Sequence, residues 1–245
     1  MSRHLLRSEL LNLGTTATAK VLLAGSMVMA AISLLANLAT ADTAELGSDA
    51  TIERVMHAST VATLTFALIA GIVSSTTDYR FGRMDQLLLS EPRSSRVLAA
   101  KTVTGFMLGV VYGLAGGAVA LAVLAAYYRV NDVAVDLTSS VVLRPLAGSL
   151  LACGLFVVFG IGLGTAVRNQ PAALGIGLAL LLVLQPPLLI GLPEFGRLLP
   201  GAAGLSMTLA PDEALFGQLA GTVLLVGWAF ALIVIGDRRL RALGA

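Results

Sequence analysis

The sequence predicts an all-α membrane protein in which a single domain, residues 1–245, crosses the bilayer six times. Composition is the first reason: 57% of the residues are hydrophobic and 12% are charged, whereas soluble domains are about 45–50% apolar and about 25% charged. The second reason is a series of six apolar runs, each long enough to span lipid. The third is the placement of lysine and arginine, which concentrate in alternate connections.

Each run is expected to be a transmembrane helix. A helix rises 1.5 Å per residue and the hydrocarbon core is about 30 Å thick, so a crossing needs roughly 20 apolar residues. None of the runs alternates apolar and polar residues as a barrel strand does, and lipid tolerates only a backbone that bonds to itself. The spans are expected at residues 21–39, 59–77, 102–127, 146–167, 172–192 and 215–236.

Basic residues predict the orientation. One set of connections contains only Arg54, Arg129, Arg144 and Arg197. The other set contains Arg3, Arg7, Lys20, Arg80, Arg83, Arg93, Arg96, Lys101, Arg168, Arg238, Arg239 and Arg241. The positive-inside rule assigns the richer set to the cytoplasm, together with both ends of the chain.

Two segments outside the spans are expected to lie at membrane surfaces. Residues 2–20 carry leucines and basic residues in a pattern that predicts an N-terminal interfacial helix, with an unstructured basic tail as the alternative. Residues 193–213 are too apolar for a free loop and too rich in proline and glycine for a span. They are expected to dip to the outer surface, or re-enter it, as short helices.

Several features inside the spans have both a structural and a functional interpretation. Glycines repeat every fourth residue at 105, 109, 113 and 117, so Gly109 and Gly113 share one helix face; packing within the subunit is favoured over a dimer seam or sliding surface. Pro186 and Pro187 are expected to kink or stop the fifth helix. The polar residues that could line a pathway, or bond to neighbouring helices, include Asn37, Thr63, Tyr112 and Gln185.

The sequence argues against chemistry on this chain. No charged residue or histidine lies deep within a predicted span, so a proton- or ion-coupling site is missing and any pump must draw its energy from elsewhere. The only histidines are His4 and His57, neither buried beside a candidate serine, and no metal-ligand motif or phosphate-binding loop is present. The single cysteine, Cys153, cannot form an intrachain disulfide. A nucleic-acid partner is not expected, because no basic cluster interleaved with aromatics occurs.

The longest predicted cytoplasmic connection, residues 78–101, is the most informative stretch. Phe81, Met84 and Leu88 fall at helical spacing with Leu87 beside them, which predicts a short amphipathic helix that Pro92 closes. A surface helix held between two spans can act as a lever, because a force on it moves both spans. The alternative is a basic amphipathic loop resting on anionic lipid.

This hairpin resembles the permease subunit of type-2 ABC exporters. In that family an acidic residue, a glycine, a Leu-Leu pair, a proline and a Ser-Arg precede a lysine at the third span. Asp78, Gly82, Leu87-Leu88, Pro92, Ser95-Arg96 and Lys101 match this order and spacing. One departure is Asp78-Tyr79, where glutamate followed by small residues is commoner.

The resemblance implies a membrane subunit of an ATP-driven exporter in the bacterial inner membrane, paired with a second permease chain in a homodimer or heterodimer. A separate ATPase subunit would grip the hairpin, and ATP and Mg²⁺ would bind to that partner rather than to this chain, which would perform no chemistry. The implied coupling residues are Asp78, Arg80, Phe81, Gly82, Met84, Asp85, Leu87, Leu88, Pro92 and Arg96. An uncharged pathway suits an apolar or amphiphilic cargo such as a drug, lipid or peptide. The alternative is a non-transporting scaffold or sensor subunit that recruits a cytoplasmic partner.

Overall fold

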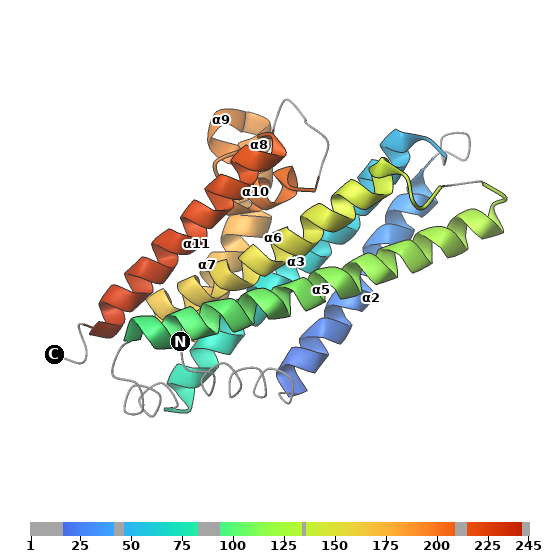
Figure 1. Ribbon diagram of the computed structural model, residues 1–245. Coiled ribbons are helices and arrows are strands. Elements are labelled where there is room, and N and C mark those ends of the chain that lie inside the picture. Colours follow the sequence, from blue (N-terminus) through green and yellow to red (C-terminus); the bar gives the residue numbers. More distant parts are fainter. Residues whose placement is uncertain (1–16, 42–46, 83–93, 134–135, 209–214, 242–245) are drawn as a thin grey trace.

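The computed structural model describes residues 17–41, 47–82, 94–133, 136–208 and 215–241, and every regular element in these ranges is a helix. Six helical segments are long and apolar enough to cross a membrane. They run up and down between the two ends of an elongated bundle (Figure 1). The predicted all-α membrane class and the predicted number of spans are confirmed.

The observed helices extend beyond most of the predicted limits. The spans are α2 (Ala17–Thr40), α3 (Asp49–Arg80), α5 (Ser94–Val130), α6 (Ser140–Val167), the run from α7 (Gln170–Leu178) through η2 (Ala179–Leu184) to α8 (Gln185–Gly191), and α11 (Gln218–Arg241). The predicted spans covered only the apolar runs, whereas helical hydrogen bonding continues into the polar residues on either side of each run. Residues 17–20 therefore belong to the first spanning helix, and the rest of the predicted interfacial helix lies outside the described residues.

Helices α3 and α6 form the centre of the bundle, where their backbones touch. A Cβ added at Gly71 of α3 would collide with the carbonyl oxygen of Val157, and one at Gly160 of α6 would lie 2.5 Å from the carbonyl oxygen of Leu68. Small residues allow this approach, which maximises dispersion contacts where lipid supplies no hydrophobic driving force. Large apolar side chains such as Phe156 and Ile72 fill the space around the crossing.

The glycine repeat of α5 packs against α6. A Cβ at Gly109 would meet the backbone of Cys153, and one at Gly113 would lie 2.9 Å from the Cα atom of Leu150. Gly105 and Gly117 face α6 side chains in the same way. The repeat is therefore a packing surface within this chain, in agreement with the favoured interpretation.

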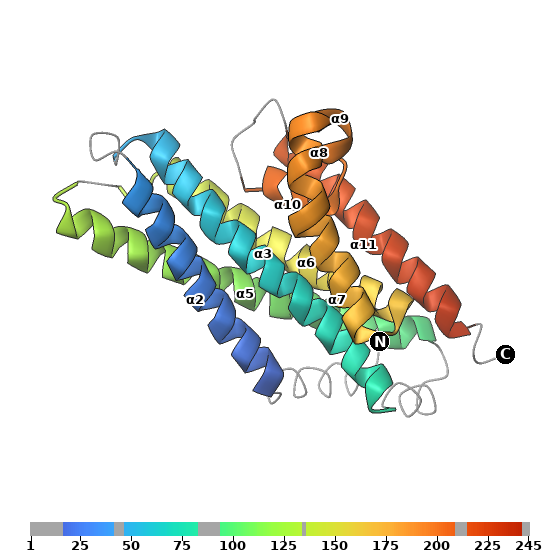
Figure 2. The ribbon, with the colours of Figure 1, turned by 180° about the vertical axis from the view of Figure 1, so that it is seen from behind.

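The outer faces of the bundle carry exposed apolar side chains. Val28 on α2, Val111 on α5, and Val223 and Phe230 on α11 are each between 46% and 72% exposed. Such a surface is suited to hydrocarbon, because contiguous apolar patches of this kind are rare on soluble monomers. Viewed from behind, α2, α3 and the α7–α8 run lie side by side (Figure 2).

The fifth span changes helix type before its two prolines. Pro186 and Pro187 have no N–H to donate, so the carbonyls one turn earlier lose their α-helical partners. The chain forms the wider π-helix η2 at this point and resumes as α8 before ending at Leu192. The fifth helix therefore continues through both prolines instead of stopping at them, and the predicted kink stays a prediction.

Two short helices follow the fifth span, α9 (Pro193–Gly196) and α10 (Pro200–Ser206). Short helices were predicted in this segment, but every residue of α10 is buried. Gly204 lies against the ring of Phe156 on α6, and Gly221 of α11 faces Ser206. The Nε1 atom of Trp228 also donates to the carbonyl oxygen of Leu198 at 2.9 Å. Helix α10 is therefore part of the packed interior.

Candidate functional site

Most basic residues in the described ranges gather at one end of the bundle, here called the basic end. It is formed by the first turns of α2, α5 and α7 and the last turns of α3, α6 and α11 (Figure 1). Its basic residues are Lys20, Arg80, Arg96, Lys101, Arg168, Arg238, Arg239 and Arg241, and its acidic residues are Asp78 and Asp237. The opposite end carries a mixture: Asp49, Glu53, Arg54, Arg129, Asp132, Asp136, Arg144, Glu194 and Arg197.

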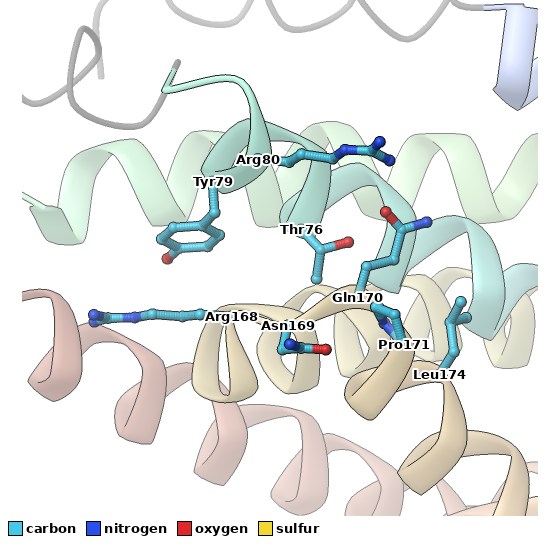
Figure 3. Close-up of a pocket in the computed structure, with 8 residues that line it drawn as sticks. All are labelled: Thr76, Tyr79, Arg80, Arg168, Asn169, Gln170, Pro171 and Leu174. Atoms are coloured by element: carbon cyan, nitrogen blue, oxygen red, sulfur yellow. The ribbon is translucent and has the colours of Figure 1, made fainter.

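At the basic end, Arg168 connects α6 to its neighbours. It ends α6 in a left-handed conformation, with φ of 60°, and its N–H donates to the carbonyl oxygen of Gly164. Its guanidinium carbon lies 5.7 Å from the centre of the Tyr79 ring, a cation–π distance. Figure 3 shows the Tyr79 side chain directed from α3 toward Arg168 across the gap between α3 and the α6–α7 turn.

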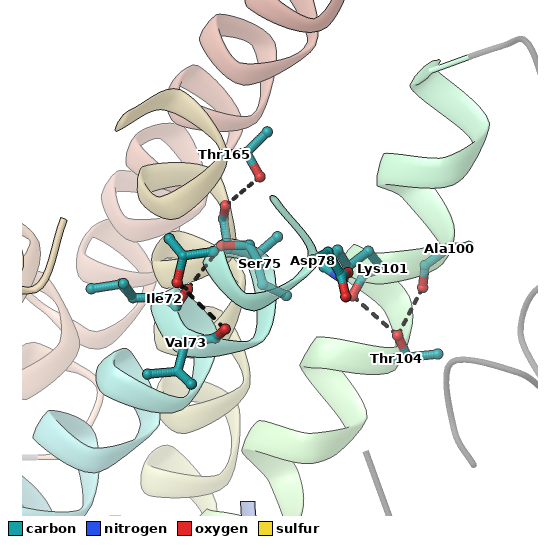
Figure 4. Close-up of polar contacts among 10 residues, drawn as sticks. Ile72, Val73, Ser75, Asp78, Ala100, Lys101, Thr104 and Thr165 are labelled. Carbon is teal, nitrogen blue, oxygen red and sulfur yellow. Dashed lines mark hydrogen bonds and ion pairs between the residues drawn. The ribbon is translucent and has the colours of Figure 1, made fainter. Parts of the chain in front are cut away.

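Asp78 of α3 and Lys101 of α5 form a buried ion pair (Figure 4). The two side chains are 1% and 2% exposed. The sequence analysis placed both residues in the connection between the second and third spans, whereas the structure places them inside the two helices. Because removing charge from water is costly, such a pair persists only when both partners are present in good geometry.

A second polar contact ties the start of α5 to α11. The Ser94 hydroxyl donates to Oδ1 of Asp237 at 2.8 Å, and Nη2 of Arg241 lies 2.5 Å from Oδ2 of the same carboxylate. Arg239 in turn donates to the carbonyl oxygen of Ala166 at 2.6 Å, which satisfies one of the last acceptors of α6. The four helices α3, α5, α6 and α11 are thus joined at the basic end by polar contacts, around a small apolar cluster of Val97, Leu240 and Tyr79.

The geometry at the end of α3 explains why a glycine occupies position 82 of the hairpin motif. The N–H of Phe81 donates to the carbonyl oxygen of Thr77, and Gly82 follows with φ of 65°, the left-handed conformation that commonly ends helices. Phe81 is 67% exposed, and Arg80 and Arg96 are exposed beside it at the two ends of the connection. The other predicted coupling residues, Met84, Asp85, Leu87, Leu88 and Pro92, lie outside the described residues, as does the predicted amphipathic helix beyond Gly82.

The structure gives most of the candidate pathway residues a local partner. The Asn37 amide donates to the Ser33 carbonyl at 2.8 Å and the Thr63 hydroxyl to the Ser59 carbonyl at 2.9 Å, both within one helix. The buried Tyr112 hydroxyl donates across to the Ala19 carbonyl of α2 at 3.1 Å. Local hydrogen bonding was the favoured interpretation of these residues.

Gln185 differs from the other pathway candidates. Its side chain is 5% exposed, and its Oε1 atom is buried with no hydrogen-bond partner among the described residues. A Cβ at Gly201 would collide with this oxygen, so only a residue without a side chain leaves room for the Gln185 amide. Gln185 therefore lies in the packing between the fifth span and α10.

An apolar groove between α2 and α3 was not anticipated from the sequence. It has a volume of about 400 Å³ and reaches the π-helix η2. The residues that line it are Met29, Ser33, Ala58, Val61, Ala62, Thr65, Phe66 and Leu182. These are ordinary residues for a spanning helix, so no pattern in the sequence could have separated them from lipid-facing positions.

Comparisons with known proteins leave the family open: no family model matches the chain, and no curated protein matches it. Among the residues that the structure describes, no group of three or more histidine, cysteine, aspartate or glutamate side chains could hold a metal ion.

Proposed function

We propose that this chain is the membrane subunit of an ABC exporter, with the basic end in the cytoplasm and a separate ATPase docked on the connection between α3 and α5. The observation that carries the proposal is the Asp78–Lys101 ion pair, which lies at the base of that connection. Both residues belong to the motif that resembles type-2 ABC exporter permeases.

The ion pair would make α3 and α5 respond together to a force on the connection. Breaking it would leave a charge buried in a medium of low dielectric constant, so the two helix ends resist separation. The Ser94–Asp237 hydrogen bond extends this link to α11. An ATPase that closes on ATP and Mg²⁺ would therefore displace several spans at once.

The exposed Phe81 offers the partner an apolar contact. At 67% exposure it stands at the end of α3, with the Arg80 guanidinium carbon 5.8 Å from its ring centre. Aromatic and arginine side chains are enriched at protein interfaces, because they combine large contact area with hydrogen bonding. The ATPase would bury the Phe81 ring.

The groove between α2 and α3 supports the proposed cargo class. Its wall is almost entirely apolar, apart from the hydroxyls of Ser33 and Thr65. These hydroxyls are themselves bonded to carbonyls of Ala58 and Val61. An apolar or amphiphilic molecule such as a drug, lipid or peptide would fit this wall, and a second copy of the chain facing it would close the pathway.

Gly82 provides a sharp test. We expect Gly82→Asp to abolish stimulation of the co-purified ATPase, because it puts a carboxylate beside Phe81 at the docking surface. Gly82→Asn is the matched control: it has the same shape without the charge, and asparagine also tolerates a positive φ. No atom of the described residues lies within 4 Å of a Cβ at Gly82, so neither variant should clash with them.

The measurement is the ATP hydrolysis rate of the complex purified through a tag on this chain. Coupled hydrolysis in the wild type and in Gly82→Asn, lost in Gly82→Asp, supports the proposal. No nucleotide-binding partner in the complex, or equal stimulation by both variants, would contradict it.

A further inference from the structure

A pocket at the basic end lies between α3 and the turn that joins α6 to α7. Its volume is about 730 Å³, within the range of about 300–1,000 Å³ for small-molecule sites. Figure 3 shows its two walls, with Thr76, Tyr79 and Arg80 on one side. Arg168, Asn169, Gln170, Pro171 and Leu174 form the other side.

The walls of this pocket are cationic. Arg80 and Arg168 contribute from opposite sides, and none of the eight lining residues is acidic. Among the described residues, the Nε and Nη2 atoms of Arg168 are buried and have no hydrogen-bond partner. An arginine always carries its charge, so an anion that reached this guanidinium would be bound favourably.

Side chains, rather than the backbone N–H groups at the start of α7, supply the affinity for an anion. Asn169 already accepts a hydrogen bond from the Ala172 N–H at 3.0 Å, and Pro171 has no N–H. The first turn of α7 therefore offers few free donors to an anion. A planar guanidinium binds phosphate oxygens in pairs, which makes Arg168 the principal candidate ligand.

The position of the pocket indicates where its ligand comes from. It lies at one end of the fifth span, where a helix of lipid-crossing length begins at Gln170. Pro171 and Leu174 give it an apolar edge, and Ile176, two residues farther along α7, is 43% exposed on the lipid-facing surface. A ligand with a phosphate and hydrocarbon tails matches both parts of this site.

We propose that this pocket binds the phosphate of an anionic phospholipid headgroup through Arg168, with Arg80 adding positive charge from the opposite wall and the acyl chains running along α7. The bound lipid would neutralise the Arg168 guanidinium and link the end of α3 to the start of α7. The binding site would thus make the basic end sensitive to the lipid composition of its leaflet.

The experiment is a titration of the full-length, delipidated protein in detergent, followed by native mass spectrometry. The probes are phosphatidylglycerol, phosphatidylcholine, glycerol 3-phosphate and inorganic phosphate. The variants are Arg168→Gln, Arg80→Gln and the matched control Arg238→Gln, which removes an exposed charge at the same end but outside the pocket. Arg80 is also exposed, so its variant keeps the test valid if Arg168→Gln fails to fold.

We expect saturable binding of phosphatidylglycerol that is tighter than that of phosphatidylcholine and is not displaced by the two soluble phosphates at equal concentration. The affinity for phosphatidylglycerol should fall about tenfold or more in Arg168→Gln, because the charge-assisted hydrogen bonds to the phosphate are lost. It should fall in Arg80→Gln and stay unchanged in Arg238→Gln.

Four results would overturn the proposal. An equal loss of phosphatidylglycerol affinity in the Arg168 and Arg238 variants would indicate that any positive charge at this end attracts the anionic lipid. Equal affinity for the two lipids would exclude selection of an anion. Displacement of the lipid by inorganic phosphate would assign the pocket to a soluble ligand. Wild-type protein that binds no lipid, but loses a co-purifying protein in Arg168→Gln, would assign the arginines to a protein carboxylate.

Discussion

The carboxylate of Asp78, near the end of α3, pairs with the ammonium group of Lys101, in the second turn of α5, and both side chains are almost completely buried. The pair joins residues 23 positions apart, on either side of the connection that resembles a coupling hairpin. Such a contact fixes the distance between two spans at the basic end, whatever the state of the chain between them.

Removal of one partner from this pair should be severely destabilising. Asp78→Asn or Lys101→Met alone takes the partner of opposite charge away from the other buried charge, and breaking a buried pair in this way typically costs about 3–5 kcal/mol. The double variant Asp78→Leu/Lys101→Met should recover most of that loss, because apolar replacements of buried pairs are often neutral. Equilibrium unfolding in detergent measures all three variants, and single variants as stable as the wild type would contradict the buried pair.

The same double variant separates folding from coupling. If the ion pair transmits force between α3 and α5, the double variant should fold but show weakened stimulation of the partner ATPase. Full stimulation in the double variant would show that packing alone transmits the movement.

Glycine substitutions should distinguish the α5–α6 contact from the lipid-facing surface. In Gly109→Ala the added methyl group meets the backbone of Cys153, and overpacking of this kind costs about 1–3 kcal/mol. Gly175→Ala on α7 is the control, because no atom of the part of the chain that the structure describes lies within 4 Å of its Cβ, and alanine is favoured over glycine in a helix by about 0.5–1 kcal/mol. Thermal unfolding in one detergent should move in opposite directions for the two variants, and equal shifts would contradict the assigned contact.

Single-cysteine labelling tests the proposed orientation. Cys153 is fully buried and should not react with a membrane-impermeant maleimide in intact cells. Ser95→Cys at the basic end and Asn131→Cys at the opposite end are both exposed positions. We expect label at residue 131 in intact cells and at residue 95 only after the membrane is opened. The reverse pattern would place the basic end outside and end the proposed function.

The pKa of the Asp136 carboxyl group should lie below its ordinary value. Its Oδ1 atom accepts hydrogen bonds from the Thr138 hydroxyl at 2.6 Å and from the Thr138 N–H at 2.9 Å, and these bonds, chiefly the first, lower the pKa of the carboxyl group. A lowered pKa in the folded state stabilises the turn above the pKa of the unfolded chain, and the contribution is lost as pH falls through the folded value. Carboxyl NMR should show the pKa of Asp136 rising in Thr138→Ala, and an unchanged pKa would refute the hydrogen bonds.

Sequence patterns predict what depends on residues close together in the chain, and they miss what depends on contacts between distant residues. Hydropathy is local, so the six spans were predicted, but the π-helix that precedes Pro186 and Pro187 was not. Most spans were predicted too short, since polar residues such as Asp78 and Lys101 continue the helices beyond the apolar windows. The burial of α10 was not predicted, because a high content of proline and glycine indicates short, irregular elements but not which helices pack against them.

The sequence by itself determined the membrane class, the number of crossings and the glycine face of α5, because each depends on residues close together in the chain. Only the tertiary structure decided that Asp78 pairs with Lys101, that Ser94 reaches Asp237 across 143 positions, and that Arg168 stacks on Tyr79. The physical reason is that these partners depend on how the helices rotate and cross, and close backbone contacts such as Gly71 with Val157 set that geometry far from the residues that it brings together.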